Sequence, residues 1–185
     1  MPSTQAVVLQ SFATASANAG AARMWKLLSP ASQRRLGPYA RFRSHAPKVP
    51  TGRLAMARVV DAVWAVGALS GSSGAFAAPL RRAPAGWRVE LAAPIHLAPI
   101  GTNEVGPVSR APGQLAAAIR AAGPVGKAAM WPDGRGFGLD GGGTSRSNIT
   151  VFGRPPGPVR DGRHVVVAFA TAGAAAVARA WTFTH

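Results

Sequence analysis

The chain has 185 residues, of which 48% are apolar, so it is long enough to bury one hydrophobic core or two small ones. Its 21 lysines and arginines outnumber six acids, and the resulting net charge of +15 favours an anionic partner. The chain contains no cysteine, which excludes disulfides, thiolate metal sites and cysteine nucleophiles.

The first predicted elements are helices. Between residues 5 and 28 apolar side chains recur every three or four positions, which is the spacing of one helical stripe, and Asn18-Ala19-Gly20 divides it into two helices. Ser29-Pro30 is typical of a helix start, because serine caps the helix and proline suits its first turn. The short helix that follows ends at Gly37-Pro38, and one more turn is expected at 39–43 before a proline-rich loop.

After Leu54 the pattern changes to strands. Three strands are predicted near 59–69, 74–82 and 86–91, and glycine-containing turns separate them. In the third strand apolar residues alternate with charged ones, which places Glu90 on the solvent face. Helices followed by an antiparallel meander predict an α+β fold for the N-terminal half, with the helices packed on a short sheet.

The C-terminal half has a different pattern. Proline-rich residues 92–113 indicate a connector, and we place the boundary between two domains, 1–98 and 99–185, near Pro99. Only short apolar runs separated by turn residues follow, which predicts an all-β sandwich. The expected strands are 115–121, 127–131, 135–139, 148–152, 164–170 and 177–184.

Both halves carry a resemblance to known folds. Residues 22–36 and 77–91 resemble the helical opening and the closing strands of bacterial nuclear-transport-factor-two-like (cystatin-like cone) domains. Asp133-Gly134 and the segment from Asp161-Gly162-Arg163-His164 through the final strand resemble bacterial immunoglobulin-like sandwich domains. The resemblance implies a cone-like α+β domain followed by an immunoglobulin-like β-sandwich domain, as in envelope-associated bacterial proteins.

The sequence gives two conflicting indications of the cellular compartment. The resemblance implies an exported or envelope-associated protein, whereas residues 1–18 lack the basic and apolar segments of a signal peptide. Glycines and serines interrupt the longest uncharged stretch, between Asp61 and Arg81, so no transmembrane segment is predicted.

Candidates for catalysis are few. Cone domains host isomerases and dehydratases as well as binding modules, so a site has to be argued from its own residues. Asp61, among valines, is a weak candidate for a buried general base, and an outward position or a salt bridge to Arg58 is the alternative. No metal or cofactor is expected, because the glycines at 141–143 lack the lysine of a phosphate loop and the histidines lack metal-ligand spacing. These histidines are His45, His96, His164 and His185.

A basic cluster is the remaining candidate site. Seven bases fall within 25 residues that contain no acid, with Tyr39 and Phe42 among them, and charge combined with stacking is how single-stranded nucleic acids are held. The bases are Arg34, Arg35, Arg41, Arg43, Lys48, Arg53 and Arg58. The alternatives are an ordinary solvated face and a GC-rich coding sequence that enriches arginine and alanine together.

Three hypotheses follow from these observations. The first is a non-catalytic binding or structural module of a bacterial envelope-type protein, with a protein or an acidic polymer as its partner. The second is polyanion binding through the seven bases. The third is a small-molecule isomerase or dehydratase that uses Asp61 in a cone pocket.

Overall fold

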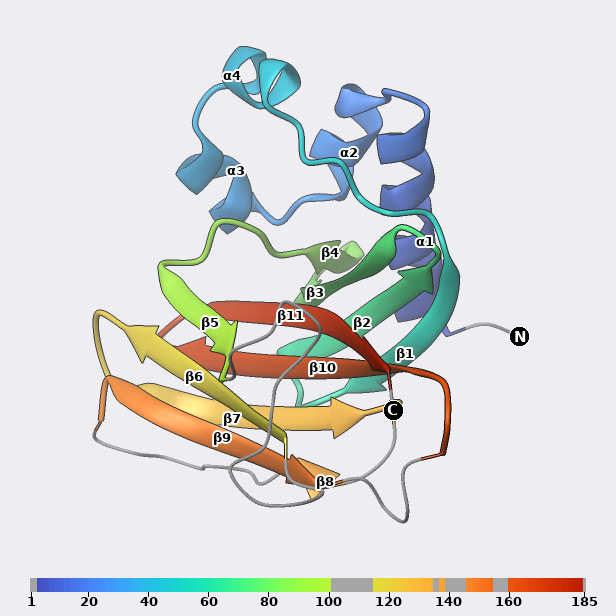
Figure 1. Ribbon diagram of the computed structural model, residues 1–185. Helices are drawn as coiled ribbons and strands as arrows, with labels where there is room; N and C mark the ends of the chain where they lie inside the picture. Colours follow the sequence, from blue (N-terminus) through green and yellow to red (C-terminus); the bar gives the residue numbers. More distant parts are fainter. Residues whose placement is uncertain (1–2, 101–114, 135–136, 139–145, 155–159, 185) are drawn as a thin grey trace. The chain divides into compact units, whose positions relative to one another are not determined.

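The computed structural model describes residues 3–100, 115–134, 137–138, 146–154 and 160–184. In this part of the chain, four short helices accompany three antiparallel sheets, and strands account for about 50% (Figure 1). The chain divides into two compact units, Met1–Ala93 and Pro94–His185. It is therefore a mainly β protein whose two units are described separately below.

The helices of the first unit begin and end within about one residue of where the sequence predicted. They are α1 (Thr4–Ala17), α2 (Ala21–Leu27), α3 (Pro30–Leu36) and α4 (Tyr39–Ser44). Ala19, with a φ of +50°, lies in the break between α1 and α2. The Ser29 side chain accepts the N–H of Ser32 and Pro30 takes the first helical position, so local capping defines the start of α3. Gly37, with a φ of +82°, ends α3 in a conformation that favours glycine.

A four-stranded meander forms the sheet of this unit. Its strands are β1 (Arg53–Val59), β2 (Trp64–Gly71), β3 (Gly74–Ala83) and β4 (Gly86–Val89), paired in that order. Helix α1 packs on the sheet, and the rings of Phe12 and Phe76 lie 6.4 Å apart. The close approach requires Gly67, because a Cβ at that position would come within 2.8 Å of Leu9 Cδ2. The core of the unit therefore lies between α1 and the sheet.

The single strand expected over 59–69 is wrong. β1 already ends at Val59 and β2 begins at Trp64, so the valine-rich segment turns back on itself. The turn depends on Asp61, whose Oδ1 accepts the N–H groups of Val63 at 2.8 Å and Trp64 at 2.7 Å. An aspartate side chain that accepts these N–H groups stabilises a turn, and here it overrides the strand preference of the valines.

Two sheets form the second unit. One pairs β5 (Ile95–Pro99), β6 (Leu115–Ala121), β9 (Asn148–Arg154) and β8 (Phe137–Gly138) in that order. The other pairs β11 (Ala175–Thr184), β10 (Arg163–Ala172) and β7 (Val125–Pro132). The sheets contact each other through β7 with β9 and β5 with β11. No helix occurs in this unit within the described ranges.

The connector expected over 92–113 contains a strand. In β5, Ile95 and Leu97 are buried while His96 between them is exposed, and this short alternation was hidden by the surrounding prolines. Pro99 pairs with Ala117 at the end of β5, which is an edge strand, where the missing N–H of proline is tolerated. The division between the units accordingly falls between Ala93 and Pro94, ahead of Pro99.

Candidate anion-binding site

One of the seven predicted bases is held by a buried carboxylate. Glu90 is 1% exposed, so its expected solvent-facing position is wrong. It follows the last residue of β4, where strand alternation has already ended, and its carboxylate accepts hydrogen bonds from the Arg35 guanidinium and the Ser29 hydroxyl. Arg35 also donates to the carbonyl of Leu91 at 3.1 Å. A fully buried carboxylate needs such partners, so Arg35 has a structural role.

Two serines complete the attachment of α3 to the end of β4. The N–H of Leu91 donates to Ser32 Oγ at 2.8 Å, and the N–H of Ser29 donates to the carbonyl of Val89 at 2.9 Å. The hydroxyl oxygens of Ser29 and Ser32 lie 3.0 Å apart. These contacts fix the position of α3 and with it the orientation of the exposed side chains that α3 carries.

The other six predicted bases are all exposed but lie on different elements. Arg34 is on α3, and Arg41 and Arg43 are on the adjoining helix α4. Lys48 lies in the segment that leads to β1, and Arg53 and Arg58 are the other two, both on β1. Because β1 is the edge of its sheet, charged residues there also have an ordinary role in protecting an open edge.

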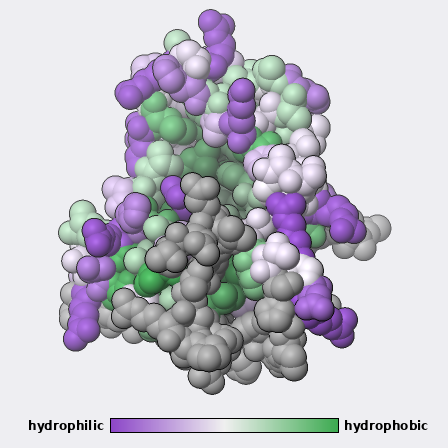
Figure 2. All heavy atoms as spheres, in the orientation of Figure 1, coloured by the Kyte–Doolittle hydropathy of each residue, from purple (hydrophilic) through white to green (hydrophobic). Residues whose placement is uncertain are grey.

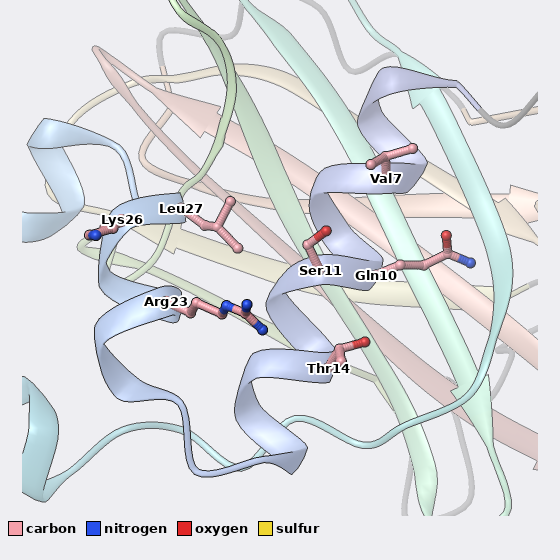
Figure 3. A pocket seen from close by; sticks show the side chains of 7 residues that line it. All are labelled: Val7, Gln10, Ser11, Thr14, Arg23, Lys26 and Leu27. Atoms are coloured by element: carbon pink, nitrogen blue, oxygen red, sulfur yellow. The ribbon is translucent and has the colours of Figure 1, made fainter.

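Two further bases, which the predicted cluster did not include, line a groove between α1 and α2. Arg23 and Lys26 of α2 lie beside this groove, whose volume is about 440 Å³. Figure 3 shows the side chains of Arg23 and Leu27 reaching from α2 toward α1, which presents Ser11. The full lining is Val7, Gln10, Ser11, Thr14, Arg23, Lys26 and Leu27. The sequence contains a signal that would have added these two bases to the cluster, because the acid-free stretch covers all of residues 1–60 and not only residues 34–58.

The two aromatic residues of the cluster have different surroundings. Phe42 is 3% exposed and packs on Trp25, with ring centroids 5.2 Å apart, so it belongs to the core rather than to a binding surface. Tyr39 is 37% exposed and meets Trp25 at 5.8 Å with the ring planes 61° apart. In this T-shaped contact Trp25 covers at most one face of the Tyr39 ring.

The exposed bases of the three short helices form what we call the basic helical surface. Its members are Arg23, Lys26, Arg34, Arg41 and Arg43. Residues 1–93 contain twelve lysines and arginines and two acids, of which Glu90 is buried and Asp61 lies in the β1–β2 turn. The helices therefore have no acid of their own to offset the positive potential. Figure 2 shows hydrophilic side chains projecting over these helices, with apolar side chains between them.

Among the remaining candidates, His164 makes a close pair with an acid. Its Nδ1 lies 2.7 Å from Asp133 Oδ2 and its Nε2 lies 2.6 Å from the carbonyl oxygen of Arg160. Both ring nitrogens face oxygen acceptors, which favours the protonated imidazole, and the hydrogen bond to Asp133 raises the pKa of His164 although burial opposes this. A ring whose nitrogens both donate is a structural clamp, not a general base.

The other candidates do not assemble a chemical site. Asp61 lies in a turn, His45 and His96 are exposed, and His185 is outside the described residues, as is most of the glycine-rich loop at 138–144. In the ranges that the structure covers, no group of three or more histidines and acids is placed to hold a metal ion.

These observations define a class, namely a mainly β protein of two units with a basic helical surface on the first. No family model, no curated protein and no solved structure matches the chain. Within the described segments, no helix has both the length and the apolar character needed to cross a membrane. The function therefore has to be inferred from the surface itself.

Proposed function

We propose that the protein is a non-catalytic binding module whose basic helical surface holds polyanions. The observation that carries the proposal is the placement of five exposed bases on three adjoining short helices, within 60 residues that contain no acid. Exposed bases repel one another unless acids or bound anions lie nearby, so a surface of this kind is most stable with an anionic partner.

The two alternative explanations of the positive charge explain fewer of the observations than anion binding does. An ordinary solvated face mixes both signs, which allows acids and bases three or four residues apart on a helix to pair, and no such pair can form within residues 1–60. A GC-rich coding sequence enriches arginine and alanine, but it does not deplete aspartate and glutamate, whose codons GAC and GAG are themselves rich in G and C.

The proposal extends to the fold of the two units. The packing of α1 on a four-stranded meander supports a cone-like α+β domain. The contact between two antiparallel sheets supports an immunoglobulin-like sandwich. A setting in the bacterial envelope rests on the sequence resemblance alone. No observation favours an isomerase or dehydratase, because Asp61 accepts hydrogen bonds that form the β1–β2 turn.

The salt dependence of binding tests the proposal. We expect the protein to bind inorganic polyphosphate and fluorescently labelled oligothymidylate, with log K falling linearly with log[NaCl]. Replacing Arg23 by Gln should weaken both complexes and reduce the steepness of the slope for oligothymidylate by roughly 0.7, the contribution of one phosphate contact in a single strand. Fluorescence anisotropy and calorimetry over a series of salt concentrations measure these quantities.

A charge-matched control is available in the second unit. Arg179→Gln removes an exposed arginine from β11 and should leave the slope unchanged. Affinity that does not respond to salt, or an equal loss in Arg23→Gln and Arg179→Gln, would show that the basic helical surface is not the binding site.

A further inference from the structure

The groove and the aromatic residues lie on opposite sides of the same helix. Successive residues of an α-helix are 100° apart, so Trp25 points about 200° away from Arg23 and from Leu27. Arg23 and Leu27 reach toward α1 and line the groove, whereas the Trp25 ring packs against Tyr39 and Phe42 of α4. Helix α2 therefore separates a cationic groove from an aromatic cluster by about one helix diameter, roughly 10 Å.

The groove suits a phosphate group. Arg23 supplies charge, and it reaches into the space between the helices that the Ser11 hydroxyl of α1 also faces (Figure 3). A volume of about 440 Å³ lies within the range of small-ligand sites, so the groove has room for a phosphate with part of the group that carries it.

The aromatic side suits a nucleobase. Tyr39 is 37% exposed, and Trp25 leaves at least one face of its ring uncovered. Arg43 follows Tyr39 by four residues on α4, the spacing that places two side chains on one side of a helix, so it stands near any phosphate attached to a base on Tyr39.

Resting on the proposed function, we propose that the polyanion is single-stranded nucleic acid, with a phosphate in the α1–α2 groove and a base stacked on Tyr39. Alternation of basic and aromatic contacts along a path is how proteins hold single strands. In a duplex the bases are already stacked on one another and cannot stack on Tyr39. Polyphosphate and anionic lipids contain no base. Only a single strand uses both sides of α2.

Replacing the ring of Tyr39 tests the proposal. Tyr39→Leu keeps apolar bulk beside Trp25 but removes the stacking face, and we expect it to weaken oligothymidylate binding about tenfold while polyphosphate binding is unchanged. Tyr39→Phe keeps the ring and should bind oligothymidylate like the unaltered protein. Arg23→Gln should weaken both ligands.

A second measurement needs no variant and so does not depend on the folding of Tyr39→Leu. The unaltered protein should bind oligothymidylate about tenfold more tightly than an abasic oligonucleotide of the same length and more tightly than duplex DNA at equal salt. Equal affinity for oligothymidylate and abasic strand, or preference for duplex or for vesicles of anionic lipid, would overturn the single-strand proposal. In that case, salt-dependent binding of polyphosphate would still support the proposed polyanion-binding function. If no polyanion binds, both the single-strand proposal and the polyanion-binding function are wrong.

Discussion

At the scale of single residues, His164 connects two segments of the second unit that are distant in sequence. Asp133, just after β7, accepts a hydrogen bond from Nδ1 of the imidazole and another at 2.9 Å from the N–H of Val165. The ring also stacks on Phe183 of β11, with centroids 5.0 Å apart. The His164 side chain is 12% exposed, whereas that of Asp133 is 50% exposed, so water reaches the acid side of the clamp.

The stability of the protein should depend on pH through this clamp. Because the folded-state pKa of His164 is raised above its ordinary value of about 6.5, the native state binds the proton more tightly than the unfolded state. The stabilisation is complete below the unfolded pKa and disappears as pH rises through the folded pKa. We therefore expect the difference in free energy of unfolding between the unaltered protein and His164→Gln to be larger near pH 5.5 than near pH 8.5.

Urea denaturation at the two pH values measures this difference. His96→Gln, which alters an exposed histidine on β5, serves as the control and should show little change in stability at either pH. A destabilisation by His164→Gln that is equal at both pH values would mean that the proton contributes nothing and that packing on Phe183 accounts for the effect.

At the scale of elements, α3 depends on a buried ion pair for its position. Arg35 and its neighbour Arg34 lie side by side in the sequence, yet only Arg35 reaches Glu90. We expect Arg35→Met to destabilise the protein by about 3 kcal/mol, because the Glu90 carboxylate, whose side chain is fully buried, then lacks its cation. Arg34→Met removes an exposed charge and should change the free energy of unfolding by less than about 0.5 kcal/mol.

A double variant distinguishes lost pairing from lost packing. Adding Glu90→Gln to Arg35→Met removes the unpaired charge and should recover part of the stability, so that the double variant is destabilised by less than the sum of the two single variants. Urea midpoints at pH 7 measure all four proteins. If the two substitutions are simply additive, the ion pair is not what holds α3 in place.

The sequence predicts those features of these elements that depend on residues adjacent in the chain. Ser29, Pro30 and Gly37 act on their own backbone neighbours, so the ends of α3 follow from the sequence. The β1–β2 turn was missed because a single side-chain interaction, that of Asp61, outweighs a run of valines. Glu90 was misplaced because its burial depends on a helix far away in the sequence, and strand alternation says nothing beyond the end of the strand.

The same distinction between local and long-range interactions applies to the candidate site. The absence of acids and the exposure of Arg34, Arg41 and Arg43 can be expected from composition and helical pattern. The spacing of bases along the chain does not encode how the helices pack. It therefore could not predict that Arg35 pairs with Glu90 or that Arg23 lines a groove with α1.

At the scale of the whole molecule, charge is unevenly distributed between the two units. Residues 1–93 have twelve bases and two acids, whereas residues 94–185 have nine bases and four acids, so the net charges are +10 and +5. The first unit has its own buried core, built from residues such as Leu9, Phe12 and Trp87. Both the charge and the core needed for polyanion binding are therefore present in one unit.

This distribution predicts that a fragment of residues 1–93 folds and binds by itself. It should unfold cooperatively on heating, and its affinity for polyphosphate should fall with salt with the slope of the full chain, because the basic helical surface lies entirely within it. The fragment 94–185 should bind more weakly and with a shallower slope. Circular dichroism establishes folding, and calorimetry at several salt concentrations compares the three proteins. A folded fragment 1–93 with a much shallower slope would place part of the phosphate contacts in residues 94–185, since the slope counts contacts wherever they occur.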